Sequence, residues 1–186
     1  MISLFFACNK KEDNEVQKPY VISEEDRKNQ KYSDSIETSE SEIKVFPLKG
    51  FYGECNLIID RNGDVLYFQN KNDVRMCGTG MENDTIPEYL DLHPKHLVKI
   101  PKDCIEKFVN ENVMNKEKRR QILVVASQTD TIKNEKFLSF FYNMKVQAYI
   151  VRRTTQEEDT VLYYKKKDMF YNSKEIKWDK SRIKIP

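Results

Sequence analysis

The run Gln121-Ile122-Leu123-Val124-Val125-Ala126-Ser127 decides the fold. Its apolar residues are continuous rather than alternating, so a strand built from them needs cover on both faces. We therefore expect residues 121–127 to form the central strand of a sheet, buried on both sides. The segments that flank this run in the sequence must help to supply that cover.

Helical periodicity flanks the run on both sides. Before it, Pro101 suits a helix start, and apolar residues then recur three and four positions apart at Ile105, Phe108, Val109 and Val113. The cations within residues 116–120 favour the end of that helix, where its dipole is negative. After the run, Asp130 or Thr131 is expected to cap a second helix that buries Phe137, Leu138, Phe141 and Met144.

The other apolar segments predict strands. Residues 43–77 indicate an antiparallel meander, with Cys55, Leu57 and Ile59 on one strand face. Asn62-Gly63 is a strong hairpin signal that would place Cys55 opposite Asn70. Further strands are expected at residues 97–100, 146–151 and 160–164, with a polar loop at 152–159 and an edge strand within 170–185. This order predicts an α+β fold, an antiparallel or mixed sheet of about six strands with two main α-helices packed on one face.

Charge is distributed unevenly along the chain. The whole sequence has 32 basic and 30 acidic residues, for a net charge of +2. Residues 9–42 are acidic, and the remainder is mildly basic with both signs interspersed. A nucleic-acid partner calls for a clustered basic surface, so none is predicted. No motif for a cofactor or a metal ion stands out either.

The chain begins with a short apolar run that ends in cysteine, Met1-Ile2-Ser3-Leu4-Phe5-Phe6-Ala7-Cys8. It is too short to span a bilayer, which needs ~20 apolar residues, and is typical of the end of a signal peptide. Phe5-Phe6-Ala7-Cys8 resembles the lipobox of bacterial lipoproteins. The resemblance implies cleavage before Cys8, lipid on its thiol and a natural start upstream of Met1. The alternative is a buried N-terminal strand with a structural cysteine.

The charged run Asn9-Lys10-Lys11-Glu12-Asp13-Asn14-Glu15 follows directly. It is similar to the lysine-plus-acidic export signal of surface lipoproteins in Bacteroidota. The resemblance implies an envelope protein anchored to the outer membrane, on its periplasmic face or at the cell surface. Residues 1–8 would then be a truncated signal segment, and the membrane would be a partner through the N-terminal lipid.

Residues 9–42 are polar and of low complexity, so they are expected to form a disordered acidic tether. The alternative is a short helix over residues 23–31, where Ser23 could cap the first turn. Residues 43–186 are expected to form a single α+β domain.

The cysteines and the long loop provide the candidate site residues. Cys55 is expected to be an ordinary core residue, and Cys77 with Cys104 is the disulfide pair to test. Residues 78–96 are the expected binding loop, since long loops in compact domains tend to be functional. Its polar candidates are Thr79, Glu82, Asp84, His93 and His96.

Three local patterns are interpreted as structural. The spacing of His93 and His96 lacks the further ligands of a metal site. Residues 60–64 are interpreted as a turn rather than a calcium loop, because the glycine and the closing glutamate are misplaced. Lys165-Lys166-Lys167 is interpreted as a solvated strand end that guards a sheet edge.

The leading functional hypothesis is a non-enzymatic binding module tethered in the cell envelope. Its partner would be another envelope protein or a surface ligand, and a specific version is an immunity or inhibitor protein. The alternative is an envelope hydrolase that uses loop carboxylates such as Glu82, Asp84 and Glu88. Such a pair must lie ~5–10 Å apart in a cleft.

Overall fold

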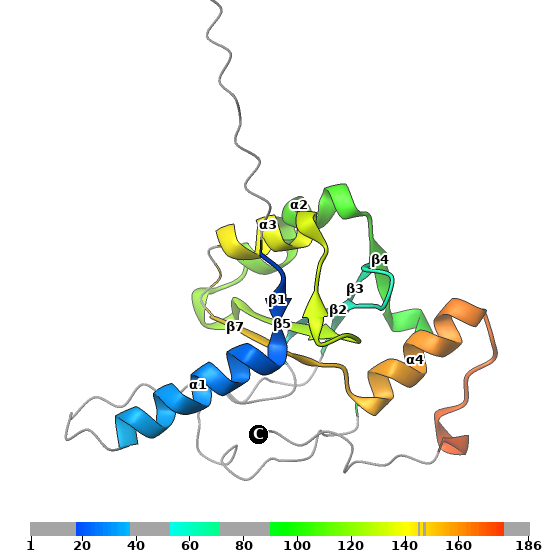
Figure 1. Ribbon diagram of the computed structural model, residues 1–186. Coiled ribbons are helices and arrows are strands. Elements are labelled where there is room, and N and C mark those ends of the chain that lie inside the picture. Colours follow the sequence, from blue (N-terminus) through cyan, green and yellow to red (C-terminus); the bar gives the residue numbers. More distant parts are fainter. Residues whose placement is uncertain (1–17, 38–52, 71–89, 145, 147, 177–186) are drawn as a thin grey trace, which may run out of the picture.

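A mixed five-stranded sheet forms the centre of the computed structural model, which describes residues 18–37, 53–70, 90–144, 146 and 148–176 (Figure 1). The strands are β1 (Tyr20–Val21), β2 (Cys55–Ile59), β3 (Val65–Gln69), β4 (Val98–Ile100), β5 (Ile122–Ser127), β6 (Thr131–Ile132) and β7 (Ala148–Arg153). The α-helices are α1 (Ile22–Glu37), α2 (Ile105–Val109), α3 (Glu135–Asn143) and α4 (Gln156–Lys167).

The strand order is β4-β3-β2-β5-β7. β2, β5 and β7 are parallel, whereas β3 and β4 run antiparallel to their neighbours. Every residue of β5 is buried, which confirms the expectation for residues 122–127. β2 rather than β5 lies in the middle of the sheet. The α+β class is confirmed, while β1 and β6 pair separately in a two-stranded ladder.

Helices cover both faces of the sheet. α2 and α3 pack on one face, where the side chains of Leu57, Leu123 and Phe137 share an apolar core. The two helices predicted on either side of residues 121–127 thus share a face, but the expectation that the main helices lie on one face alone is wrong. α4 covers the opposite face through Val161 and Leu162, which pack with Ile58, Leu66 and Phe68 of β2 and β3. Burial of each large apolar side chain contributes roughly 1.5–3 kcal/mol.

The β2–β3 hairpin is one residue out of the predicted register. Cys55 pairs with Gln69 rather than Asn70, and Ile59 pairs with Val65. The loop is therefore longer than a two-residue turn. The Asp60 carboxylate accepts hydrogen bonds from the amides of Asn62 and Asp64 (2.7 and 2.9 Å) and holds the loop, while Gly63 takes a positive φ of 75°.

The predicted strand at residues 160–164 is wrong, because this segment belongs to α4. Thr155 and Glu158 form a reciprocal capping box at its start. Acidic residues occupy the first turn and Lys165-Lys166-Lys167 the last, which complements the helix dipole. The lysine run is thus a helix end rather than a strand end, and the predicted loop at 152–159 is the end of β7 and the start of α4.

The N-terminal described segment is ordered against the domain, contrary to the tether expected there. Tyr20 pairs with Ile132 in the β1–β6 ladder, and Ile22 is buried. Ser23 donates its backbone N–H and its hydroxyl to the Asp130 carboxylate (3.1 and 2.7 Å). α1 then continues to residue 37, so the helix alternative for residues 23–31 is the one found, and the helix is longer.

The helices around β5 also differ in detail from the expectation. α2 begins after a 3-10 turn at Lys102–Cys104 and passes into a π-helical turn at Asn110–Met114. Asn134 rather than Asp130 or Thr131 caps α3, and accepts the N–H of Phe137 (3.1 Å). The first and last parts of the predicted meander, residues 43–52 and 71–77, lie outside the described residues. Within 170–185, the described part contains a 3-10 turn at Ser173–Glu175.

Candidate functional site

A groove between α2 and α3 is the candidate binding site. Its first wall follows from the four-residue spacing of Ile105, Val109 and Val113, which directs these side chains into the core. Asn110 and Met114, the first and last residues of the π-helical turn, line the groove. Single π-turns inside helices are frequent at functional sites.

The second wall comes from α3. Phe137, Leu138 and Phe141 are buried against the sheet, as predicted. Phe140 and Met144, four residues apart, form a second apolar stripe that is only partly buried and faces the groove. Met144 therefore lies at the rim of the core instead of within it.

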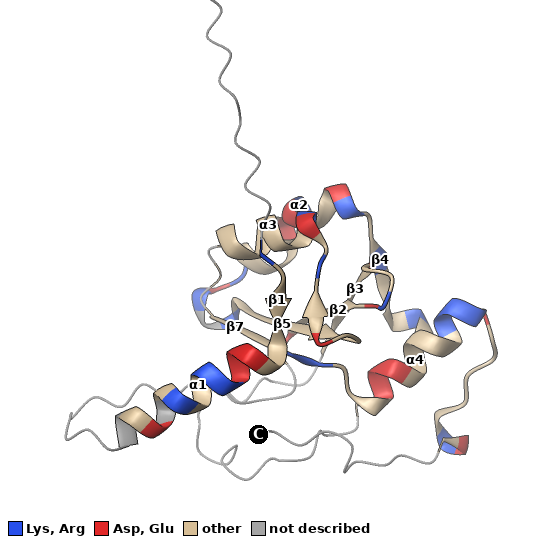
Figure 2. Cartoon of the chain, viewed as in Figure 1, with Lys and Arg blue, Asp and Glu red and all other residues tan. Residues whose placement is uncertain are grey.

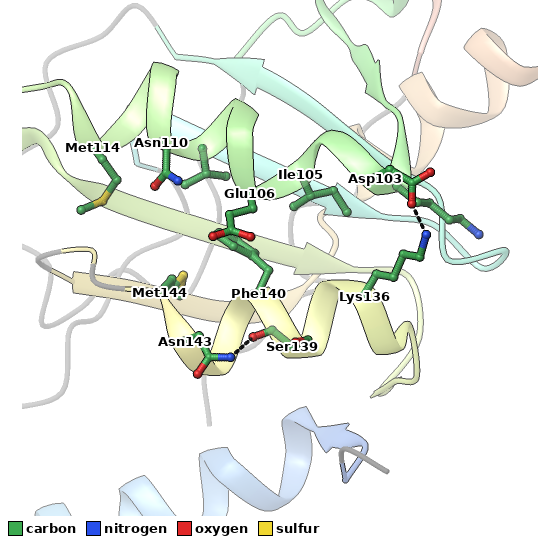
Figure 3. Close-up of a pocket in the computed structure, with 12 residues that line it drawn as sticks. Asp103, Ile105, Glu106, Asn110, Met114, Lys136, Ser139, Phe140, Asn143 and Met144 are labelled. Atoms are coloured by element: carbon green, nitrogen blue, oxygen red, sulfur yellow. Dashed lines mark hydrogen bonds and ion pairs between the residues drawn. The ribbon is translucent and has the colours of Figure 1, made fainter. Parts of the chain in front are cut away.

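The groove encloses about 600 Å³ (Figure 3). Its floor is apolar, and polar side chains line both rims. The Lys136–Asp103 ion pair crosses from α3 to the turn before α2 at one end, while Met114 and Met144 lie at the other. Glu106, Asn110 and Met114 line the groove on the α2 side, and Phe140, Asn143 and Met144 line it on the α3 side. This arrangement can hold an apolar group flanked by hydrogen-bonding groups.

A second hollow of about 750 Å³ lies beside the groove, at the carboxyl ends of β2 and β5. Lys102 and Lys136 line both hollows. Ligands of parallel sheets commonly bind at this end of the strands. Here, however, the most buried acid, Asp60, is already engaged. Burial would raise its pKa, but Lys166 (2.6 Å) and the two loop amides outweigh this and lower the pKa of Asp60.

A third polar cluster lies at the start of β2. Glu54 is buried and bonds Arg120 through both carboxylate oxygens (2.7 Å each) and Lys116 through one (2.6 Å). Arg120 and then Lys116 hold the pKa of Glu54 at about 2, against the effect of burial. These cations, predicted to close a helix, instead fasten the α2–β5 connection to the sheet.

The predicted loop residues are only partly described. Thr79, Glu82, Asp84 and Glu88 lie outside the described residues. His93 precedes a 3-10 turn that contains His96, and its backbone N–H donates to His96 Nδ1 (3.2 Å). The His93 ring contacts those of His96 and Tyr171 edge-on. Neither histidine lies in the groove.

Two of the four cysteines, Cys55 and Cys104, lie within the described residues. Cys55 is fully buried in the core, as predicted, and burial raises the pKa of its thiol. Cys104 is exposed with a free thiol at the start of α2. Cys77 and Cys8 lie outside the described residues, so the Cys77–Cys104 disulfide and the lipidation of Cys8 remain predictions.

The described ranges lack two kinds of feature, a metal-binding cluster and a membrane-spanning helix. These ranges contain no group of three or more acidic, histidine or cysteine side chains arranged to hold a metal ion. No helix within them is both long and apolar enough to cross a bilayer.

The sequence analysis missed the groove residues Asn110, Phe140 and Asn143. A signal existed, because Phe140 and Met144 share a helical stripe beside the one that faces the core. The π-helical turn that contains Asn110 has no comparable sequence signature. The chain matches no family model, and no curated protein or solved structure is significantly similar to it.

Proposed function

We propose that this chain is a lipid-anchored lipoprotein of the cell envelope that binds another envelope protein through the α2–α3 groove. The Cys8 lipobox resemblance supports the anchor. The composition of the groove supports the binding role. Two methionines and a phenylalanine provide its apolar lining, and amide and carboxylate side chains lie beside them.

Methionine side chains suit a docking surface because they are flexible and polarisable. Met114 and Met144 are partly buried and come from opposite walls, so both can adjust to one apolar side chain between them. Phe140 supplies a rigid aromatic surface in the same groove. An apolar anchor residue of a partner is therefore the group that this floor fits.

The rims favour a peptide-like partner over a purely apolar ligand. Asn110 and Asn143 are exposed on the two walls, and Asn143 donates one amide hydrogen to the Ser139 carbonyl (2.8 Å). Their remaining amide groups can both donate and accept hydrogen bonds. A partner helix or loop with an apolar residue between polar ones matches this lining, which suits an immunity or inhibitor protein.

Photo-cross-linking in the native envelope tests the binding role. A photoreactive residue at Asn110 should give a discrete protein adduct, and the same probe at the exposed Glu111 of the same turn should not. Adding Phe140→Arg should remove the adduct, whereas Tyr142→Arg on α3, outside the groove, should keep it. Equal adducts at both probe positions would contradict the proposal.

Metabolic labelling tests the anchor separately. The full chain, expressed in a bacterial host, should incorporate radioactive fatty acid and fractionate with membranes. Cys8→Ser should abolish the label, while Cys104→Ser, the matched control at an exposed cysteine, should retain it. An unlabelled chain found in the soluble fraction would refute the anchor.

A further inference from the structure

Apolar side chains project from the C-terminal end of α4. Phe170 is 87% exposed, the highest value among the large hydrophobic residues of the described ranges, and Tyr163 and Met169 are about half exposed. We call Tyr163, Met169 and Phe170 the apolar knob. Figure 1 shows α4 and the segment after it on the side of the sheet away from α1.

The backbone holds the knob in a defined position. Asp168 adopts a left-handed conformation (φ 50°). Its N–H bonds the Lys165 carbonyl (3.4 Å), and the N–H of Met169 bonds the Tyr164 carbonyl (3.2 Å). This pair of bonds is the Schellman arrangement that closes a helix end.

The residue after Phe170 is fixed as well. The ring of Tyr171 contacts those of Tyr164 and His93 edge-on, with centroids 5.2 and 5.3 Å apart. Phe170 therefore lies between two anchored residues and still points into solvent. Contact with an apolar phase would remove most of this ring from water, which is favourable.

Lysines flank the knob in the sequence. Residues 163–176 contain four lysines, Lys165, Lys166, Lys167 and Lys174, and two acids, Asp168 and Glu175. Lys165 donates to the Pro94 carbonyl and Lys166 pairs with Asp60, while Lys167 is exposed beside the knob. The blue end of α4 in Figure 2 shows this concentration of positive charge, opposite the acidic first turn.

The proposed anchor leaves the domain close to a bilayer. Tyr20 is fixed to the domain by its pairing with Ile132, and the described chain begins at Lys18. Even a fully extended connection from Cys8 to Lys18 spans at most about 35 Å. The short connection favours a membrane, rather than a distant partner, as the surface that the knob meets.

We propose that the apolar knob is a second membrane contact, which inserts Phe170 and Met169 among the headgroups of an anionic bilayer. Phe170 and Met169 would be buried at the boundary of the acyl chains, and the exposed Lys167 ammonium group would lie near the phosphates. The inference rests on the proposed function only for the lipid anchor that brings the domain near a membrane. It adds an orientation, with the end of α4 facing the bilayer.

Vesicle co-sedimentation of the full unacylated chain, carrying Cys8→Ser, tests the contact without the anchor. The chain should bind vesicles of phosphatidylcholine with phosphatidylglycerol, and bind phosphatidylcholine alone much more weakly. Phe170→Ser should weaken binding about tenfold, through the lost apolar burial. The matched control Tyr142→Ser, at a half-exposed aromatic of α3, should bind as the parent does.

A charge reversal separates the electrostatic part. Lys167→Glu should weaken binding to the anionic vesicles roughly tenfold, and the difference should shrink at high salt. Circular dichroism of each variant verifies that α4 is retained, so that loss of binding is not loss of fold.

Three outcomes would overturn the inference. The first is no binding to either vesicle, and the second is equal binding by the Phe170→Ser and Tyr142→Ser variants. The third is a Phe170→Ser variant that keeps vesicle binding but loses the protein adduct formed by the probe at Asn110, because the knob would then contact a protein rather than a membrane. The fatty-acid labelling of Cys8 is independent of all three. Failure of the anchor and failure of the knob are therefore distinguishable.

Discussion

The two faces of the sheet are stabilised by different means. Under α2 and α3, the core is a continuous apolar cluster built around side chains such as Leu57, Leu123 and Phe137. Under α4, the apolar cluster is smaller, and the buried acids Glu157 and Glu158 lie close to it. Apolar burial is non-directional, whereas buried charges require specific partners. The first face therefore tolerates adjustment, and the second fixes the position of α4.

The α4 face satisfies its buried charges one by one. Arg152 donates to both Glu158 carboxylate oxygens (2.8 and 2.9 Å). Glu157 accepts the backbone N–H groups of Leu90 and Leu92 (2.9 and 2.6 Å), and burial raises its pKa. These polar bonds thus attach the start of α4 to β7, and the segment before β4 to α4.

The largest expected effect is on the apolar face. Phe137→Ala removes a fully buried ring from between α3 and the sheet and leaves a cavity. We expect a loss of about 4 kcal/mol in the free energy of unfolding, measured by urea denaturation. Tyr142→Ala, on the solvent side of the same helix, should cost under about 1 kcal/mol. Similar losses for the two variants would contradict an apolar core under α3.

The second effect, on the polar face, tests whether charge pairing matters there. Arg152→Met leaves the Glu158 carboxylate buried without its guanidinium partner, and should cost about 3 kcal/mol. Adding Glu158→Gln removes the orphaned charge but keeps an acceptor for the Thr155 N–H. Denaturation of the double variant should recover at least half of the loss. A double variant less stable than Arg152→Met would refute the assignment.

The third effect is a pH dependence on the polar face. The pKa of Asp60 is lowered in the folded chain, so its contribution is present above about pH 4 and is lost as pH falls through the lowered value. Asp60→Asn should cost about 2 kcal/mol at neutral pH and flatten the acid decline of stability. Glu157, whose pKa is raised, acts in the opposite sense, since its contribution is lost as pH rises. Thermal unfolding across acidic pH measures both slopes.

The smallest effect is a gain at the end of α4. Asp168 occupies a left-handed position that favours glycine. Asp168→Gly should therefore raise the free energy of unfolding by about 0.5–1 kcal/mol. The control Asp103→Gly, at an exposed site with ordinary backbone angles before α2, should give no gain. A destabilised Asp168→Gly variant would mean that the Asp168 side chain itself stabilises the knob.

The predictions from sequence succeeded where one short segment contained the whole signal. Residues 122–127 and 65–68 were predicted as strands, because apolar continuity and the Asn62-Gly63 turn are local features. The core positions of α3 followed from helical periodicity. The strand expected at 160–164 failed because Val161 and Leu162 were considered without the Thr155–Glu158 capping box, a signal that was present in the chain.

Other features had no local signal. The β2–β3 register is an exception, because the Asp60 carboxylate folds back onto its own loop within four residues. The place of residues 20–22 depends on Ile132 and Asp130, which are remote in sequence. The α2–α3 groove exists only once two helices lie side by side over one sheet face, and a π-helical turn shapes one wall.

The sequence by itself determined the class of fold, the buried strand at 122–127 and the apolar stripe of α3. These features follow from hydrophobic periodicity, which involves near neighbours along the chain. Only the tertiary structure decided that α4 covers the second face, that Lys166 meets Asp60, and that Phe170 is left exposed. These outcomes depend on which distant surfaces remain to be covered after the sheet has formed, and no single segment encodes that.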